Sequence, residues 1–410
     1  MTVIRELEPL MGKSLGKREN NMKLYQPDYY DKFQCTASAC PMTCCMQWRI
    51  AVDDETFLRW PQEWKKQVKE VEEGHVIRLK KNGMCPFLNE EKLCKIVLKS
   101  GDQTISHTCQ TFPREEHRYH GRIERCLTPG CPAVLDLMWG QDDFHIRERD
   151  IQDNKIEEKK IHGQEIRGQK VKEEAPNEEI CELNPILFEI RDWFLEIVNN
   201  KQLPLNTALE ICFLIAVDLY EFEQKGILEK EFMHYKNVTN IQKIREAIGT
   251  NDQMTEDRLE EYNLLFLDIS EIYRKQKIYA DFLVPLAKEA EKLDCRKIEY
   301  WSEFEPKLAP WKEHLRKLFA EEISSAVITP GTEQVLDMLV KLEWIAMEYA
   351  VLLQVLFLQG NTGEITYEKL RESVCVIFRM MGYADDDIWE YMENCFDQVI
   401  WPWEYYALLV

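Results

Sequence analysis

The sequence predicts a mainly α protein in which a loop-rich cysteine-cluster metal domain is followed by an all-helical domain. Nine of the fourteen cysteines lie between residues 35 and 131. From residue 184 onward, apolar residues recur at the spacing of an amphipathic helix. Charge separates the same two regions, because residues 26–140 carry 16 basic and 16 acidic side chains, whereas residues 181–410 carry 23 basic and 42 acidic ones.

Composition divides the chain into four parts. Residues 1–21 mix charged residues, glycine and asparagine with little periodicity, which predicts a disordered N-terminal extension. Residues 22–140 form the predicted cysteine-cluster metal-binding domain. Residues 141–180 contain runs of charge with scarcely an aromatic residue, as expected of a linker. Residues 181–410 form the predicted acidic helical domain.

The second half contains repeated helix signals. In the first predicted helix, Ile186, Ile190, Trp193 and Ile197 line one face, and Pro185 suits the first turn. Four later stretches show the same periodicity, at residues 207–224, 258–274, 333–359 and 367–381. We interpret their apolar stripes as the core of a helix bundle rather than as a cofactor surface.

The density of cysteine indicates sulfur chemistry, for which disulfides, structural zinc and iron–sulfur ligation compete. Disulfide frameworks are typical of small secreted chains that lack a core, whereas this chain has 410 residues, is 45% hydrophobic and shows no secretory signal. Metal ligation is therefore the better interpretation. The candidate metal ligands are Cys35, Cys40, Cys44, Cys45, Cys85, Cys94, Cys109 and Cys131.

Local geometry restricts how these cysteines can bind. The side chains of the neighbours Cys44 and Cys45 diverge, so the two sulfurs do not easily bind one ion. Pro86 stiffens the backbone that presents Cys85. None of the cysteine pairs has the two-residue gap of a zinc knuckle. Three histidines in the same stretch could replace a thiol, although a solvent-facing position is the simpler interpretation: His107, His117 and His120.

Several short motifs carry a family resemblance. They are Tyr-Tyr-Asp-Lys-Phe-Gln-Cys ending at residue 35, Ser-Ala-Cys ending at 40, Cys-Cys-Met-Gln-Trp-Arg-Ile starting at 44, Cys-Pro-Phe-Leu starting at 85, Thr-Cys-Gln-Thr-Phe-Pro-Arg ending at 114, Glu124-Arg125, Cys131-Pro132 and Leu187-Phe-Glu-Ile-Arg-Asp192. This set resembles the flagellin lysine-N-methylase family, within a cysteine-cluster superfamily of zinc- or iron-chelating proteins. The resemblance covers residues 22–410, densely at first and diffusely later. Two positions depart from it, since Gln110 replaces an expected basic residue and Cys126 replaces a serine, which leaves Cys126 as a spare thiol.

The resemblance implies an enzyme, a protein-lysine N-methyltransferase with flagellin as its protein substrate. S-adenosyl-L-methionine would be the methyl donor, and an iron–sulfur cluster of the 4Fe–4S type would lie in the cysteine domain. Such a cluster would either stiffen a loop-rich fold or hold the donor at an open iron position. Eight candidate cysteines exceed the four that one cubane needs, so either some are structural thiols or a second metal is present.

The sequence identifies neither catalytic residues nor a donor-binding motif. It contains no Gly-x-Gly-x-x-Gly loop, Walker A loop, Gly-x-Ser-x-Gly elbow or Cys-x3-Cys-x2-Cys run. A lysine must lose its proton before it attacks, and Tyr29, Tyr30 or Asp31 could accept that proton, although packing is the simpler role for them. The alternative function is a non-catalytic zinc- or iron-binding module attached to a helical interaction domain.

Charge and hydropathy exclude two classes of partner. The acidic excess argues against nucleic acid, which requires a basic stripe. The most apolar runs, at residues 211–217 and 349–358, are too short to span a bilayer, so we expect no membrane association and a soluble cytoplasmic protein with reduced thiols. Five further cysteines are interpreted as small apolar residues on helical segments: Cys181, Cys212, Cys295, Cys375 and Cys395.

Overall fold

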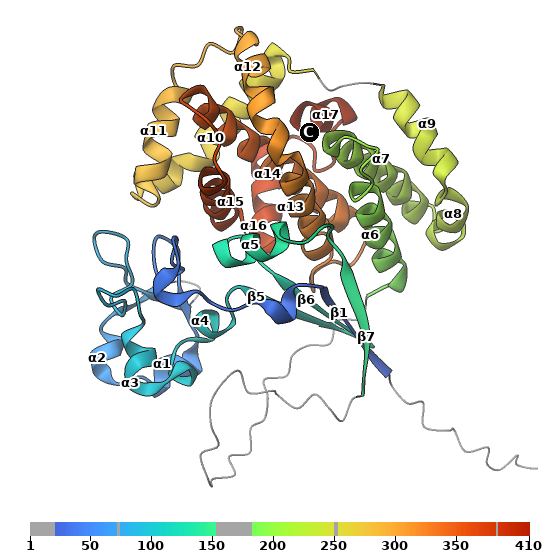
Figure 1. The fold of residues 1–410 in the computed structure, drawn as a ribbon. Helices are drawn as coiled ribbons and strands as arrows, with labels where there is room; N and C mark the ends of the chain where they lie inside the picture. The colour runs from blue at the N-terminus through green and yellow to red at the C-terminus, as the bar shows by residue number, and fades with distance from the viewer. Residues whose placement is uncertain (1–20, 72–73, 153–182, 250–252, 383) are drawn as a thin grey trace, which may run out of the picture.

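The structure is a computed structural model that describes residues 21–71, 74–152, 183–249, 253–382 and 384–410 (Figure 1). It confirms the predicted mainly α fold, with an all-helical C-terminal part. Residues 1–20 of the predicted extension and Cys181 lie outside the described residues. In the ranges that are described, no helix is both long enough and apolar enough to cross a membrane.

A four-stranded sheet connects the N-terminal half of the chain to the helices (Figure 1). Its order is β5-β6-β1-β7, with β1 parallel to β6 and antiparallel to β7. Tyr25 on β1 consequently pairs with Glu124 on one side and with Glu148 on the other. The strands are β1 (Asn21–Pro27), β5 (Arg114–Tyr119), β6 (Arg122–Leu127) and β7 (Ile146–Gln152).

Strand β7 occupies the start of the segment for which the sequence predicts a linker. Its arginines form ion pairs with acidic residues that follow β1: Arg147 Nε lies 3.1 Å from Asp28 Oδ1, and Arg149 Nη2 lies 3.1 Å from Asp31 Oδ2. These ion pairs, together with the backbone pairing of β7 with β1, allow a highly charged segment to form a strand. Residues 153–180 of the predicted linker lie outside the described residues. The linker prediction can therefore be compared with the structure only at positions 141–152.

A small module spans residues 45–109, and we call it the cysteine module. It has its own hydrophobic core, in which Trp60 and Phe87 meet edge to face with their ring centroids 5.5 Å apart. A three-stranded sheet in the order β2-β4-β3 contributes to this core. Its elements are β2 (Ala51–Val52), α1 (Asp54–Arg59), α2 (Gln62–Lys65), β3 (Val68–Val71), β4 (Gly74–Ile77), α3 (Lys95–Ser100) and α4 (His107–Thr111).

The second core is larger and is shared by the four-stranded sheet and the helices. Helix α14 passes through its middle and is buried along almost its whole length, in contact with α7, α10 and α15. The remaining helices are α5 (Pro132–Trp139), α6 (Pro185–Val198), α7 (Leu205–Gln224), α8 (Leu228–Tyr235), α9 (Val238–Ile248), α10 (Glu256–Lys275), α11 (Ala280–Ala290), α12 (Glu299–Leu308), α13 (Lys312–Ser325), α14 (Val335–Asn361), α15 (Tyr367–Met381), α16 (Asp385–Cys395) and α17 (Trp403–Leu409).

The two cores divide the region that the sequence treats as one cysteine domain. Strands β5, β6 and β7 and helix α5 contribute to the large core, whereas the cysteine module packs on the small one. Helix α13 contacts both α5 and α6, and Trp139 Nε1 of α5 donates a hydrogen bond to the His314 carbonyl of α13 at 3.0 Å. The sheet is therefore fixed to the helices, and the cysteine module extends from its β5 edge (Figure 1).

Candidate functional site

Four of the predicted ligands come together in the cysteine module. Cys45, Cys85, Cys94 and Cys109 all pack on its core, with Cys85 buried and the other three partly buried. The Cys85 amide donates to the Cys45 carbonyl at 2.8 Å, and Leu88 forms an isolated β-bridge with Cys94. Burial raises the pKa of Cys85 to about 12 and that of Cys109 to about 11, and the neighbouring thiols add to both increases. We call these residues the four-thiol group.

Asp53 fixes the helix that carries Cys109. Its Oδ1 atom accepts a hydrogen bond from the Thr56 amide at 2.8 Å, which caps α1, and its Oδ2 atom accepts one from the His107 amide at 2.9 Å. Burial opposes ionisation of Asp53, but these amide donors hold its pKa below the ordinary value. The Cys109 amide in turn donates to the Ser106 hydroxyl at 3.4 Å. Helices α1 and α4 are thereby held together through one carboxylate.

Cys44 lies beside the four-thiol group. Its thiol hydrogen-bonds to Cys45 and lowers the pKa of Cys45 to about 7, while the pKa of Cys44 itself is raised by that bond and by burial. Cys44 is also close enough to Cys109 for the two charges to interact. The structure thus places one member of the adjacent pair in the four-thiol group and the other against it.

Cys40, Cys131 and Cys375 form a second thiol group at the junction of the sheet and the helices. Cys131 directly precedes α5, and burial raises its pKa to about 11, with a further contribution from Cys40. Cys375 is fully buried on α15, with its sulfur 3.8 Å from the Pro129 carbonyl. Burial raises the pKa of Cys375, and the nearby Cys131 and Cys40 add to the increase. The structure therefore adds Cys375 to the neighbourhood of two predicted ligands.

The other cysteines lie apart from these two groups. Cys35 is exposed, and its sulfur accepts a hydrogen bond from the Ala37 amide at 3.4 Å. Cys126 is on β6, and its thiol donates to Glu115 Oε2 at 3.7 Å. Cys212 is buried within α7, as expected of a small apolar residue, whereas Cys295 lies in the connection between α11 and α12 rather than on a helix.

The four-thiol group fits a metal centre in ligand type and number. Four thiolates are the usual ligands of a 4Fe–4S cluster and of a structural zinc ion. All thirteen described cysteines are free. Across the described residues, no three His, Cys, Asp or Glu side chains converge closely enough to hold a metal ion in this structure. Of the three candidate histidines, His107 is exposed at the start of α4, and His117 and His120 belong to β5 and the turn after it, outside the cysteine module.

Arg379 of α15 links the helices to both thiol groups. Its Nε atom donates to the Gly130 carbonyl at 2.7 Å, and Nη2 donates to the Met42 carbonyl at 2.9 Å. Its positive charge also contributes to the lowered pKa of Cys45. A side chain at position 130 would place its Cβ atom 3.1 Å from Arg379 Cγ, so glycine permits this close approach. The position of the Met42–Cys45 segment therefore depends on a residue of the C-terminal part.

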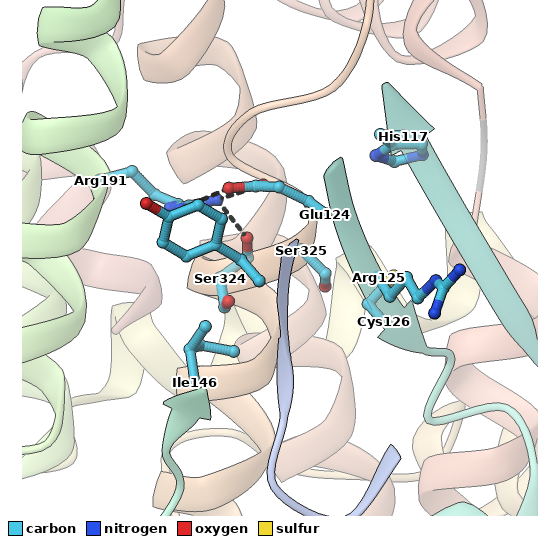
Figure 2. Close-up of a pocket in the computed structure, with 9 residues that line it drawn as sticks. His117, Glu124, Arg125, Cys126, Ile146, Arg191, Ser324 and Ser325 are labelled. Carbon is cyan, nitrogen blue, oxygen red and sulfur yellow. Dashed lines mark hydrogen bonds and ion pairs between the residues drawn. The ribbon is translucent and has the colours of Figure 1, made fainter. Parts of the chain in front are cut away.

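Two of the sequence motifs, Glu124-Arg125 and Leu187–Asp192, meet in a buried ion-pair network (Figure 2). Arg191 of α6 is 2% exposed and donates to the two carboxylate oxygens of Glu124 on β6, at 2.6 and 2.9 Å. It also donates to the Ser324 carbonyl at 3.0 Å and to Asp192 Oδ1 at 2.7 Å. Burial opposes the charge on Glu124, but Arg191 and Arg122 hold its pKa below the ordinary value. Two motifs that lie far apart in the sequence are thus in direct contact in the folded protein.

Arg122 extends this network to the surface. Its Nε atom donates to Glu124 Oε1 at 2.6 Å. The guanidinium lies between two aromatic rings, 3.6 Å from the centroid of Tyr25 and 4.1 Å from that of Phe188. Cation–π contacts of this kind favour a fixed orientation of the side chain. The network therefore holds β1 and β6 against α6.

Three cavities adjoin the network. The smallest, about 20 Å³, is shown in Figure 2 and is lined by Arg191, Glu124 and Cys126 among others. A cavity of about 420 Å³ lies between β7 and α6, and we call it the β7–α6 cavity. A third cavity, of about 280 Å³, lies beside the turn between β5 and β6 and is lined by the basic residues Lys23, His120 and Arg122. Tyr25 lines all three cavities.

The predicted proton acceptors beside Cys35 have structural partners. Tyr29 is buried and donates to Glu321 Oε2 of α13 at 2.8 Å. Glu321 is itself 1% exposed, and burial raises its pKa to about 7. Burial raises the pKa of Tyr30 to about 12, and Asp31 pairs with Arg149. Tyr29 therefore connects the chain near the cysteines to the helices, a role consistent with packing.

Comparisons with known proteins bear on this arrangement. The chain is 30% identical over 131 residues to the lysine-N-methylases of Salmonella typhimurium and Salmonella choleraesuis. These matches cover 29% of this chain and 33% of each relative, so the chain spans about a third of the length of those relatives. The flagellar biosynthetic protein FliU of Salmonella muenchen is also 30% identical over 131 residues, and the match covers 78% of that protein.

No family model and no solved structure matches this chain. The likeness to the wider cysteine-cluster superfamily therefore stays a prediction. The relatives support the narrower likeness, because FliU is matched over more than two thirds of its length. On this basis, the chain belongs to the family of the flagellar biosynthetic protein FliU.

Proposed function

We propose that this protein is a protein-lysine N-methyltransferase that transfers methyl groups from S-adenosylmethionine to lysine side chains of flagellin. The observation that carries the proposal is its similarity to two lysine-N-methylases and to FliU. The first two names describe methyl transfer to lysine, and the third describes a role in flagellar biosynthesis. Flagellin is the substrate that the family resemblance implies, and its methylation would fit both descriptions.

We also propose that the four-thiol group holds a 4Fe–4S cluster. Cys45, Cys85, Cys94 and Cys109 supply the four thiolates that such a cluster requires. The lowered pKa of Cys45 favours its thiolate form, which is the form that binds metal. When bound, the cluster would supply a rigid centre for the cysteine module and a Lewis acid at any open iron position. Asp53 and Arg379 would hold the segments that carry the ligands.

The transfer step requires a neutral lysine. An ordinary lysine has a pKa of about 10.4, so only roughly one amine in two thousand is unprotonated near pH 7. When chemistry limits turnover, the rate should therefore rise with pH until the amine of the bound lysine is neutral. The free thiols of the described residues suit a reducing compartment, and we propose a cytoplasmic location.

Mass spectrometry of flagellin tests the proposed function. Flagellin from cells that contain this protein should carry methylated lysines, and flagellin from cells that lack it should not. Purified, cluster-loaded protein should transfer labelled methyl from S-adenosylmethionine to flagellin, and a lysine-to-arginine flagellin should gain no label at the replaced positions. Absence of label on unaltered flagellin, with the cluster intact, would refute the enzymatic proposal.

The second candidate function is a non-catalytic metal module on a helical interaction domain. It is favoured by the four-thiol group itself, because four cysteines around a small separate core also form structural zinc sites. Anaerobic purification separates the two candidates. A brown protein with visible absorbance indicates an iron–sulfur cluster, whereas a colourless protein with stoichiometric zinc indicates the structural module.

A further inference from the structure

We propose that the β7–α6 cavity binds the side chain of a lysine presented by the protein substrate. The inference rests on the proposed function, since it states where the methyl-accepting side chain docks. It is drawn from the shape, the walls and the charge of this cavity, which has a volume of about 420 Å³. A volume of this size lies in the range typical of sites that bind small molecules and side chains.

Most of the walls come from helix α6 and strands β1 and β7, and the segment that precedes β7 adds Phe144 and His145. Asp192, Leu195 and Glu196 line the cavity at spacings of three and four residues, so they occupy one face of α6, and Asn199, which caps the helix, continues that face. On the opposite side lie Tyr25 of β1 and its cross-strand partner Glu148 of β7. The distance between the walls is held by the buried pair of Arg191 with Glu124, beneath Asp192. Most of the site is therefore built on a helix and two strands of the sheet.

Part of the lining is apolar and suits the methylene groups of a lysine. Phe144 is buried, and Tyr25, Ile146 and Leu195 are partly buried, so each offers carbon surface to the cavity. Long cationic side chains commonly lay their methylene stems along such surface and keep the charged end in a polar environment. An apolar wall beside carboxylates is the arrangement that this kind of side chain requires.

The charge of the cavity favours a cation. Three carboxylates line it, of which Glu148 pairs with Lys23 and Asp192 pairs with Arg191. Glu196 is exposed and forms no ion pair within the described part of the chain. It is the carboxylate that an incoming ammonium would meet, and the imidazole of His145 also lines the cavity.

The neighbouring cavity of about 280 Å³ provides an internal comparison. It shares Tyr25 and Asp192 with the β7–α6 cavity, but its lining includes Lys23, His120 and Arg122. The cationic Lys23 and Arg122 repel an ammonium, because like charges that share a site are destabilising. Among these two adjacent cavities, charge complementarity therefore assigns the lysine to the one between β7 and α6.

Binding and methyl transfer should depend differently on pH. Glu196 attracts the protonated amine, so affinity for a lysine peptide should stay constant from pH 7 to about pH 9 and fall as pH passes about 10.4. Methyl transfer requires the neutral amine and should instead accelerate as pH rises. Docking can therefore be measured separately from the reaction, in the absence of the methyl donor.

The test uses the full-length protein and a fluorescent, acetylated and amidated heptapeptide with one central lysine among glycines and serines. A second peptide carries norleucine in place of lysine and has no charge. Fluorescence anisotropy at low salt gives the dissociation constants. Because exposed ion pairs are worth about 0.2–1 kcal/mol, Glu196→Gln should weaken binding of the lysine peptide by a factor of roughly 1.4 to 5. The double variant Glu148→Gln, Glu196→Gln should weaken it further, and neither should change binding of the norleucine peptide.

Glu189→Gln is the matched control. Glu189 is an exposed carboxylate on the same helix, but it lines the smaller cavity, so this variant should bind the lysine peptide as the unaltered protein does. Equal binding of the two peptides, or unchanged affinity in both Glu196 variants, would overturn the docking inference. Selective lysine binding without any methylation of flagellin would instead refute the proposed function and leave the docking site standing.

Discussion

Replacing Glu321 by glutamine tests whether a buried carboxyl group destabilises this protein at neutral pH. Glu321 is 1% exposed on α13, where its Oε2 atom accepts the hydrogen bond from the Tyr29 hydroxyl at 2.8 Å. Its Oε1 atom forms no hydrogen bond of normal geometry within the described residues, although the Leu127 amide lies near the carboxyl group and opposes part of the rise in its pKa. A glutamine can keep its carbonyl oxygen towards Tyr29 and place its amide group where Oε1 lies. The substitution therefore removes the ionisable group and keeps the contact.

The magnitude follows from the pKa of Glu321. Burial raises it from an ordinary value of 4.5 to about 7 in the folded protein. Between these values the folded state keeps the proton and the unfolded state releases it, so the free energy of unfolding falls as pH rises. A difference of about 2.5 pKa units corresponds to about 3 kcal/mol, which is lost between about pH 4.5 and pH 7. Glutamine cannot ionise, so the variant avoids this loss.

Urea unfolding followed by circular dichroism at pH 4.5, 6 and 7.5 measures the effect. The free energy of unfolding of Glu321→Gln, minus that of the unaltered protein, should increase by about 3 kcal/mol across this range. The subtraction cancels the titration of groups common to both proteins. Glu229→Gln, an exposed carboxylate on α8, should show no such trend. A difference for Glu321→Gln that does not change with pH would show that the buried carboxyl is not protonated as the structure requires.

Three further predictions concern the four-thiol group, Arg379 and the segment that precedes Met22. Serine at any position of the four-thiol group should reduce bound iron to background and destabilise the cysteine module, whereas Cys212→Ser should leave iron content unchanged; full iron retention in all four variants would contradict the ligand assignment. Arg379→Met removes two short charge-assisted hydrogen bonds, to Gly130 and Met42, and a longer one to Thr43, and should lower the free energy of unfolding in urea by about 3 kcal/mol, with Arg379→Lys intermediate; an unchanged value would exclude a linking role. A protein that starts at Met22 should keep its iron content and methylation rate, and loss of either would assign a role to the preceding segment.

The helices could be predicted because their signal is local. Apolar periodicity predicts a helix at residues 367–381, and α15 spans Tyr367–Met381. The predicted stretch at residues 333–359 corresponds to α14, which spans Val335–Asn361. Strand β7 could not be predicted in the same way. Its charged sequence resembles a linker until Arg147 and Arg149 meet their partners beside β1, and such pairing depends on tertiary structure.

The candidate site could likewise be predicted only where the signal in the sequence is local. The thiols and the motifs that contain Glu124 and Arg191 could be identified from the sequence, because they are defined by residue type and by the order of neighbouring residues. The sequence cannot identify the contact of Arg191 with Glu124, which joins α6 to β6. Nor does the sequence single out Cys375 or Arg379, since an isolated cysteine or arginine in an amphipathic helix has no signal of its own.

The partition of the cysteines into two groups addresses why eight candidates exceed the four that one cluster needs. The four-thiol group packs on a small core that is separate from the large one, so a bound metal would contribute directly to the folding of the cysteine module. Cys131 and Cys375, by contrast, are buried against the large core, which holds them in place without a metal. Excess cysteine therefore need not mean a second cluster. We infer that Cys131 and Cys375 serve as packing at the contact between the sheet and α15. The four thiols of the cysteine module are those whose position a metal would determine.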